Sequence, residues 1–166
     1  IMAVEQGAVQ VQGTFNGYGE RCGNADLSVI IPNLQIKRGK SCIREEGLRE
    51  LSSACRYISE LANLPHNERQ PYVGNCAFAH KGGMHIDGVM KNRHSFEHIA
   101  PELVGNERRI LMSEVSGRST ILKKIQEVAP WVNKDSEETI HIMDKLKQLE
   151  HEGYQFEGAE SSFELV

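Results

Sequence analysis

The order of elements predicted over the first forty residues limits the fold most. Residues 1–7 have the pattern of the last two turns of an amphipathic helix that ends at Gly7, and residues 8–15 alternate apolar and polar side chains like a short strand. A loop with glycines at 13, 17, 19 and 23 follows, and a helix begins near Ala25. Helix, strand, glycine-rich loop and helix form the repeating unit of α/β proteins, whose functional loops lie at the carboxyl ends of strands. Because the chain begins inside this predicted helix, we expect it to be a piece of a longer protein.

The rest of the chain is predicted to be mostly helical. Apolar residues at helical spacing predict a helix over residues 45–61, which would bury Cys55 as a small hydrophobic side chain. The later elements expected are short helices at 86–91 and from Pro101, a strand at 109–113, a helix with Ile121, Leu122, Ile125 and Val128 on one face stopped by Pro130, and a final helix capped by Ser136 and ended by Gly153. The buried stripe of the final helix is expected to be Ile140, Met143, Leu146 and Leu149, with Trp131 filling the joint before it.

Composition restricts the classes of partner. The 166 residues are 39% hydrophobic and 25% charged, which is typical of a soluble globular protein. The 19 basic and 23 acidic residues give a net charge of −4, which argues against nucleic acid as a partner, and no apolar run approaches the roughly 18 residues that span a bilayer. The four cysteines form no CxxC pair, which favours reduced thiols and a cytoplasmic location.

The glycine-rich loop is the first candidate functional site. It lacks the GxGxxG and GK[ST] spacings of nucleotide-binding loops. A tight structural turn is one interpretation, because glycines permit positive φ angles and close approach of the backbone. Polar side chains that such a turn does not require are interleaved with the glycines, namely Asn16, Glu20, Arg21 and Asn24. This density of polar groups favours an active-site loop.

A second candidate lies at residues 80–85, where His80 and His85 flank a pair of glycines. Two histidines at this spacing could bind a metal, perform acid–base chemistry or lie on the surface, because the imidazole pKa is the one nearest neutrality. The residues alone favour the surface position. His94 and His98 could share a helix face, and we interpret them as solvated.

Taken together, these segments resemble the acyl-CoA-condensing synthases that include 2-isopropylmalate, citramalate and homocitrate synthase. The resemblance rests on Gly7-Ala8, on the run from Gly13 to Asn24 (GTFNGYGERCGN), on His80 to Val89 (HKGGMHIDGV), on Pro101 to Gly105 and on Ser116-Gly117-Arg118. The order and spacing of these motifs agree with the family along nearly the whole chain, and the citramalate branch is the most similar.

The resemblance implies a fold and a reaction. The fold is α/β: residues 1–40 would be the last strand–loop–helix unit of a TIM barrel, and 41–107 and 108–166 would be two small, mostly helical linker subdomains. In such enzymes a divalent metal (Mg, Mn or Zn) binds a 2-oxo acid, a base removes a methyl proton from acetyl-CoA, and the enolate attacks the ketone. The implied substrate is pyruvate first and 2-oxoisovalerate next, in branched-chain amino-acid biosynthesis. The family also implies a homodimer with intertwined subdomains.

The resemblance also assigns residues. Asn24 matches a metal ligand of the family, and His85 matches a histidine implicated in proton transfer. Glu20 is the second expected catalytic residue, and the loop beside substrate and CoA comprises Asn16, Gly17, Gly19, Arg21 and Gly23. Phe96 stands where many members carry a tyrosine, so the hydroxyl of that position is absent from this chain.

The chain departs from the family pattern in what it lacks. The aspartate of the first barrel strand and the HxH pair are absent, since none of the seven histidines forms an HxH. We therefore expect the isolated chain to be inactive while its parent is an acyltransferase. Two alternatives are a non-catalytic helical dimerisation module and a barrel fragment of the hydroxymethylglutaryl-CoA lyase type.

Overall fold

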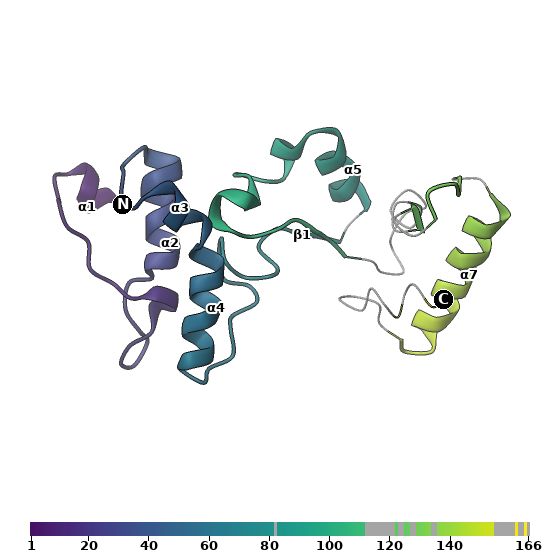
Figure 1. Ribbon diagram of the computed structural model, residues 1–166, viewed down its shortest axis with the longest axis horizontal. Coiled ribbons are helices and arrows are strands. Elements are labelled where there is room, and N and C mark those ends of the chain that lie inside the picture. Colours follow the sequence, from purple (N-terminus) through teal and green to yellow (C-terminus); the bar gives the residue numbers. More distant parts are fainter. Residues whose placement is uncertain are drawn as a thin grey trace. The chain divides into compact units, whose positions relative to one another are not determined.

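The computed structural model divides into two compact units. The first comprises residues 1–78 and 99–108, and the second comprises residues 79–98 and 109–166 (Figure 1). The residues that the structure describes are 1–81, 83–111, 122, 125–126, 129–133, 136–154, 162 and 165. The described part is mostly helical with one small parallel sheet. Each helix in this described part is too short or too polar to span a bilayer.

The first unit begins with helix α1 (Met2–Glu5). Gly7 follows this helix with a φ of +107°, the left-handed conformation that is common just after a helix end, as predicted. The strand predicted over residues 8–15 is wrong. Residues 8–13 are neither helix nor strand, and Val9 is fully exposed; the segment makes only an isolated bridge between Thr14 and Asp26. A strand exists by pairing its backbone with a neighbour, and the alternating pattern alone supplies none.

A short turn and a helix follow this segment. The turn is the 3₁₀ element η1 (Phe15–Gly17), which lies against both α2 and α4 (Figure 1). Helix α2 (Leu27–Pro32) starts two residues later than predicted and continues as the π-helical turn η2 (Asn33–Lys37).

Helix α2 begins where it does because Asp26 caps it. The Asp26 carboxylate accepts hydrogen bonds from the backbone N–H of Ser28 at 2.9 Å and from its hydroxyl at 2.6 Å. These bonds satisfy a donor that the first helical turn would otherwise leave unpaired.

The helix predicted over residues 45–61 is present as two pieces, α3 (Glu45–Arg49) and α4 (Leu51–Leu61), which break at Glu50. The core of this unit forms around them, and Cys55 is completely buried there as predicted. The buried members of the core are Leu48, Leu51, Cys55, Tyr72, Val73, Phe78, Ile99 and Val104. The helix predicted from Pro101 is confirmed as η4 (Pro101–Val104), and Ser52 of α4 binds it through a 2.7 Å hydrogen bond to the Val104 carbonyl.

The second unit contains the sheet. Strand β1 (Ala79–His80) pairs in parallel with β2 (Arg109–Ile110), so the strand predicted at 109–113 is confirmed at its start. Helix α5 (Gly83–Lys91) confirms the helix expected at 86–91 and begins three residues earlier, and the 3₁₀ turn η3 (Arg93–Ser95) follows it.

The last helix, α7 (Glu137–His151), is capped as predicted. The hydroxyl of Ser136 accepts a hydrogen bond from Thr139 N–H at 3.3 Å, and Gly153 ends the helix region with a φ of +99°. Met143 and Leu146 are buried and pack with Ile125.

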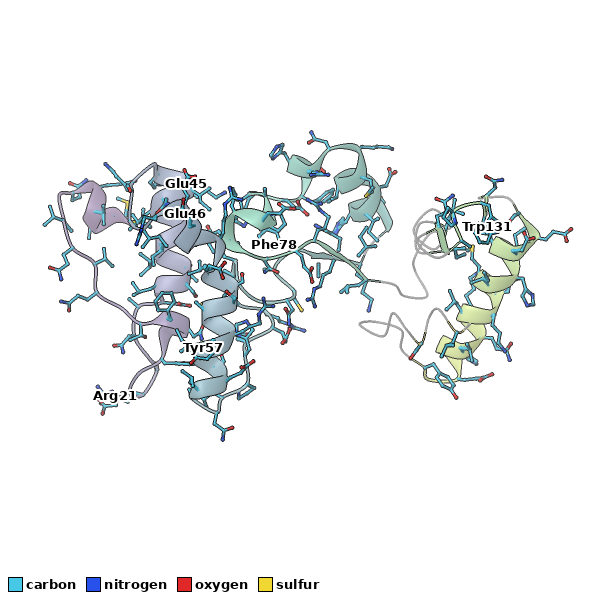
Figure 2. The ribbon with its side chains drawn as sticks, in the orientation of Figure 1. Arg21, Glu45, Glu46, Tyr57, Phe78 and Trp131 are labelled. Atoms are coloured by element: carbon cyan, nitrogen blue, oxygen red, sulfur yellow. The ribbon has the colours of Figure 1, made fainter. Side chains whose placement is uncertain are left out.

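Two packing predictions for this region are wrong. Ile140, expected in the buried stripe, is 40% exposed, and Trp131 is 78% exposed and does not fill a joint (Figure 2). Thr139, one position before Ile140, is buried instead, because it lies one and two helical turns before the buried Met143 and Leu146 and so shares their face of α7. Its hydroxyl donates a 2.8 Å hydrogen bond to the Asn133 carbonyl. The motif Ser116-Gly117-Arg118 and most of the helix predicted before Pro130 lie outside the described residues. The division at residues 40 and 107 stays a prediction.

Candidate functional site

The glycine-rich loop, which includes η1 and the residues between it and α2, has an unusual backbone. Asn16 and Arg21 adopt the left-handed conformation with φ of +58° and +55°, and Gly17 and Gly23 have φ of +67° and +88°. Glycine adopts this conformation freely, whereas for a residue such as arginine it costs on the order of 1 kcal/mol. Such strained residues persist only where the surroundings hold them, and they concentrate at functional sites.

Asn16 is the residue that fastens the loop to the core. Its side-chain amide donates to the Cys55 carbonyl at 2.8 Å and to the Ser59 hydroxyl at 3.2 Å, both on α4. Its Oδ1 atom is buried and has no hydrogen-bond partner among the described residues. The structure therefore places Asn16 in contact with a helix as well as in the loop.

Asn24 is held by the carbonyl groups of Gly17 and Tyr18, which lie across the loop from it. Its backbone N–H donates to the Gly17 carbonyl at 2.8 Å, and its side-chain nitrogen donates to the Tyr18 carbonyl at 3.0 Å. The same Tyr18 carbonyl accepts the Thr14 hydroxyl at 2.6 Å. Because the amide nitrogen is the bound atom, the Oδ1 atom of Asn24 is the one left to act as a ligand.

Two glycines make this arrangement sterically possible. A Cβ atom on Gly19 would overlap the side-chain amide of Asn24, and one on Gly23 would overlap the Gly17 carbonyl that accepts the Asn24 N–H. Gly23 also needs its positive φ. The predicted loop residues thus form one folded unit around Asn24.

Glu20 and Arg21 lie at the tip of this loop. Their side chains form an ion pair of 2.8 Å, and each is 80% exposed. Figure 2 shows Arg21 directed away from α2 and α4. A pair so exposed contributes little to stability, so both side chains are available to a ligand.

Below the loop, Asp26 joins α2 to the segment around Gln70. The Gln70 amide donates to the second carboxylate oxygen of Asp26 and, at 3.3 Å, to the Ser28 hydroxyl. Burial, reinforced by the nearby Asp26 carboxylate, raises the pKa of the Cys55 thiol to about 11. This thiol is therefore neutral and unreactive at neutral pH.

His85 lies on α5 in the second unit. Its side chain is exposed, and its ring stacks on Phe96 with the centroids 4.5 Å apart and the planes at 33°. Gly88 leaves room for the Phe96 ring, which a Cβ atom at that position would overlap. The Phe96 ring thus contacts the imidazole while His85 stays exposed.

The other histidine of the motif behaves differently. His80 is buried on β1, and its Nε2 atom lies 3.0 Å from the carboxylate of buried Glu97. Since Glu97 follows Phe96 directly, this pair also fastens the segment that carries the ring packed on His85. The surface position favoured for the two histidines is confirmed for His85 and wrong for His80.

A metal ion at this loop would need ligands beyond those that the described residues bring together. Among these residues, no group of three His, Cys, Asp or Glu side chains is placed to hold a metal ion. An amide oxygen is a hard ligand that Mg²⁺, Mn²⁺ and similar ions accept, so the free Oδ1 of Asn24 fits one position of a larger ligand set.

The sequence missed several residues of this site. Tyr18, Ser59 and His66 form hydrogen bonds beneath the loop, and Gln70 binds the cap of α2. The Asp26-x-Ser28 pattern ahead of an apolar run is a readable cap signal. Ser59 gave no local signal, because its bond to Tyr18 spans 41 residues.

The comparisons with known proteins cover the whole chain. The family described as homocitrate synthase post-HMGL domain-like matches residues 72–154, and the HMGL-like family matches residues 1–55. The chain is 51% identical to an (R)-citramalate synthase of Geobacter sulfurreducens and 52% identical to one of Synechocystis sp., over all 166 residues in both alignments. It is 38% identical over 154 residues, or 92% of its length, to a probable 2-isopropylmalate synthase of Methanopyrus kandleri.

The chain covers 31% of the Geobacter protein and 30% of each of the other two, so it spans less than a third of these relatives. The glycine loop lies within the HMGL-like match, and His85 lies within the post-HMGL match. With an HMGL-like segment followed by the post-HMGL domain, this chain belongs to the homocitrate synthase post-HMGL domain-like family, and it is similar over its whole length to a segment of the (R)-citramalate synthases.

Proposed function

We propose that the protein carrying this chain condenses acetyl-CoA with pyruvate to form citramalate, on the route to isoleucine. One observation carries the proposal: the loop binds the side-chain nitrogen of Asn24 and leaves its side-chain oxygen available to a ligand. The names of the relatives support the choice of pyruvate, since the Geobacter and Synechocystis proteins, which both match over the whole chain, are (R)-citramalate synthases. Condensation with 2-oxoisovalerate is the second candidate, favoured by the probable 2-isopropylmalate synthase.

In this proposal Asn24 is one ligand of a divalent metal, and the parent protein supplies the others. When bound, such a metal polarises the ketone of the 2-oxo acid. The loop residues Gly17, Gly19 and Gly23 keep the backbone close around Asn24 and fix its amide before substrate arrives. Holding the amide in advance lowers the entropic cost of assembling the site.

His85 is proposed to move a proton during the condensation. An exposed imidazole can exchange a proton with solvent, and its contact with Phe96 limits the orientations of the ring. Phe96 has no hydroxyl, so the proton moves through His85 without help from that side chain. Glu20 is proposed as an acid–base group of the loop, and Arg21 as a cation that attracts the phosphates of CoA.

The assembly is also part of the proposal. We expect a cytoplasmic homodimer in which the subdomains of one subunit reach the other. Exposed apolar side chains on the first unit, among them Val9, Tyr57 and Leu61, support burial of further surface in the complete protein.

The experiment uses the complete protein of which this chain is a segment. CoA release is measured with acetyl-CoA, added Mg²⁺, Mn²⁺ or Zn²⁺, and either pyruvate or 2-oxoisovalerate. The proposal expects release that requires metal and is faster with pyruvate; faster release with 2-oxoisovalerate would favour the second candidate. Asn24→Ala should weaken Mn²⁺ binding, whereas Asn133→Ala, which alters an exposed asparagine ahead of α7, should not. Release that depends on neither metal nor oxo acid would refute the proposal.

A further inference from the structure

Ser59 of α4 is a buried hydroxyl with an unusual number of polar neighbours. It is 2% exposed. Its Oγ atom lies 3.0 Å from the Tyr18 hydroxyl, 3.2 Å from the Asn16 amide nitrogen and 3.3 Å from Nδ1 of His66. A fourth neighbour, the Cys55 carbonyl, is 3.0 Å away. Two of these contacts come from the glycine loop.

The hydrogens at this centre can be assigned from the chemistry of the partners. A hydroxyl oxygen accepts two hydrogen bonds and donates one. Tyr18 and Asn16 are donors, so they fill both acceptor positions of Ser59. His66 Nε2 lies 3.3 Å from the Val73 carbonyl, which can only accept, so Nε2 carries the proton of the neutral ring. Nδ1 is then an acceptor, and the Ser59 hydrogen is shared between it and the Cys55 carbonyl.

This centre is connected to Asn24 through a single residue. The Tyr18 side chain is bound by Ser59, and the Tyr18 carbonyl accepts the side-chain nitrogen of Asn24 at 3.0 Å. A movement of Tyr18 therefore moves the acceptor that orients the Asn24 amide. Glu20 and Arg21 pair with each other at the exposed tip, and no hydrogen bond or ion pair found among the described residues joins their side chains to α2 or α4.

We propose that Ser59 is a positioning residue of the site, which holds the Asn24 amide oxygen in place through Tyr18, and that His66 orients the Ser59 hydroxyl. The part of this proposal that concerns metal binding rests on the proposed function. The part that concerns the coupling of Ser59 to Asn24 does not.

The same helix supplies a matched control. Ser52 is also completely buried on α4, and its hydroxyl donates a 2.7 Å hydrogen bond to the Val104 carbonyl of η4. Ser52 thus has a buried hydrogen bond between two elements, and none of its described hydrogen bonds involves the loop. A general loss of stability should thus appear in Ser52→Ala as well as in Ser59→Ala, whereas a change at Asn24 should appear only in the latter.

The first experiment uses the 166-residue chain and NMR. In Ser59→Ala, we expect the side-chain NH₂ resonances of Asn24 to shift and the exchange of its backbone N–H to quicken about five- to tenfold, as the loss of one hydrogen bond implies. Tyr18→Phe removes the other end of the same bond, keeps the ring, and should give the same changes if Ser59→Ala does not fold. The double variant should add little to either single change. Unaltered Asn24 signals in folded Ser59→Ala or Tyr18→Phe, or equal changes in Ser52→Ala, would overturn the proposal.

The second experiment measures Mn²⁺ affinity in the complete protein. Ser59→Ala should weaken binding about 10- to 100-fold, the usual effect of removing a group that orients a ligand, and Ser52→Ala should leave it unchanged. If Asn24→Ala leaves the affinity unaltered, the metal role of Asn24 fails, and the NMR result still decides the positioning role of Ser59. If Asn24→Ala weakens binding and Ser59→Ala does not, the positioning role fails alone.

Discussion

Gly19 lies against the side-chain amide of Asn24, and this amide occupies the space that a methyl group on Gly19 would need. Its φ is not in the left-handed region, so the chain needs glycine at this position for room and not for backbone conformation. A larger residue at position 19 would therefore displace the Asn24 amide, which we propose as a metal ligand.

Gly19→Ala should displace the Asn24 amide and break its hydrogen bond to the Tyr18 carbonyl. In the complete protein we expect Mn²⁺ affinity to fall about 10- to 100-fold, because the ligand loses its orienting partner. Calorimetric titration with Mn²⁺ measures the effect.

The control for this change is Gly47→Ala on α3. The nearest atom to a Cβ there is Ile43 Cδ1 at 3.8 Å, an ordinary contact. Alanine is the better helix former by about 0.8–1 kcal/mol, so this variant should bind Mn²⁺ normally with unchanged or higher stability. Equal Mn²⁺ affinities for both variants would contradict the steric argument.

Asp26→Ala should lower the free energy of unfolding of the chain by about 1–2 kcal/mol. The change removes the cap of α2 and leaves the Gln70 amide without its carboxylate partner. Urea unfolding followed by circular dichroism measures the loss. Asp87→Ala, which breaks only the exposed Asp87–Lys91 pair on α5, should change the value by no more than about 0.5 kcal/mol. If Asp26→Ala lowers the free energy of unfolding no more than Asp87→Ala does, the cap does not stabilise the chain.

The stability of the chain should fall as the pH rises from about 9 to 11. The Cys55 thiol has an ordinary pKa of 9.0, which burial raises to about 11 in the folded chain. The unfolded chain therefore loses this proton first, and stability that is fully present below pH 9 is lost as the pH rises toward the folded pKa, by about 2–3 kcal/mol for a shift of this size. Burial also raises the pKa of Tyr72 and adds to the decline in the same direction.

Cys55→Ala isolates this effect. Its unfolding free energy should fall less steeply over the same pH range, and an identical slope would rule out the thiol as the cause. In the native protein at pH 8, a thiol reagent should label the exposed Cys22, Cys42 and Cys76 and spare Cys55 until urea is added.

The helices of this chain could be predicted well because their signals are local. Periodic apolar residues placed α4 and α7 close to their observed positions, Pro101 marked the start of η4, and Ser136 and Gly153 marked where the last helix begins and ends. The strand over residues 8–15 failed because pairing is a long-range property, and the alternating pattern does not contain the partner.

The candidate site could be predicted only in part, because some of its interactions are local and others are long-range. The loop residues lie in one continuous run, so the sequence showed them together. The interactions that fasten this run to the rest of the first unit come from residues at separations of 39 to 44 along the chain, such as Cys55 with Asn16 and Gln70 with Asp26. No periodicity or local motif marks such contacts. The catalytic and metal roles of His85, Glu20 and Asn24 stay predictions.

His85→Ala in the complete protein should lower turnover by about 10²–10⁴-fold, the usual contribution of a positioned acid–base group. The imidazole is exposed on α5 and held against Phe96, so its removal should leave the fold intact. Steady-state CoA release with pyruvate measures the effect. His94→Ala, at an exposed position in η3, is the matched control and should retain turnover. Turnover of His85→Ala near that of His94→Ala would remove His85 from the mechanism.

The isolated 166-residue chain should not catalyse the condensation. Polarising a ketone needs a metal held by several protein ligands, and Asn24 offers one neutral amide oxygen, which is too weak a ligand to retain a divalent ion against water. In the described residues no cluster of three His, Cys, Asp or Glu side chains supplements it. Without further walls to orient both substrates, much of the roughly 7–11 kcal/mol that proximity can contribute is also lost. The assay is CoA release from acetyl-CoA with pyruvate or 2-oxoisovalerate and Mg²⁺, Mn²⁺ or Zn²⁺, with the complete protein as the positive control. Release by the isolated chain that depends on both metal and oxo acid would mean that it builds a metal site from residues besides Asn24.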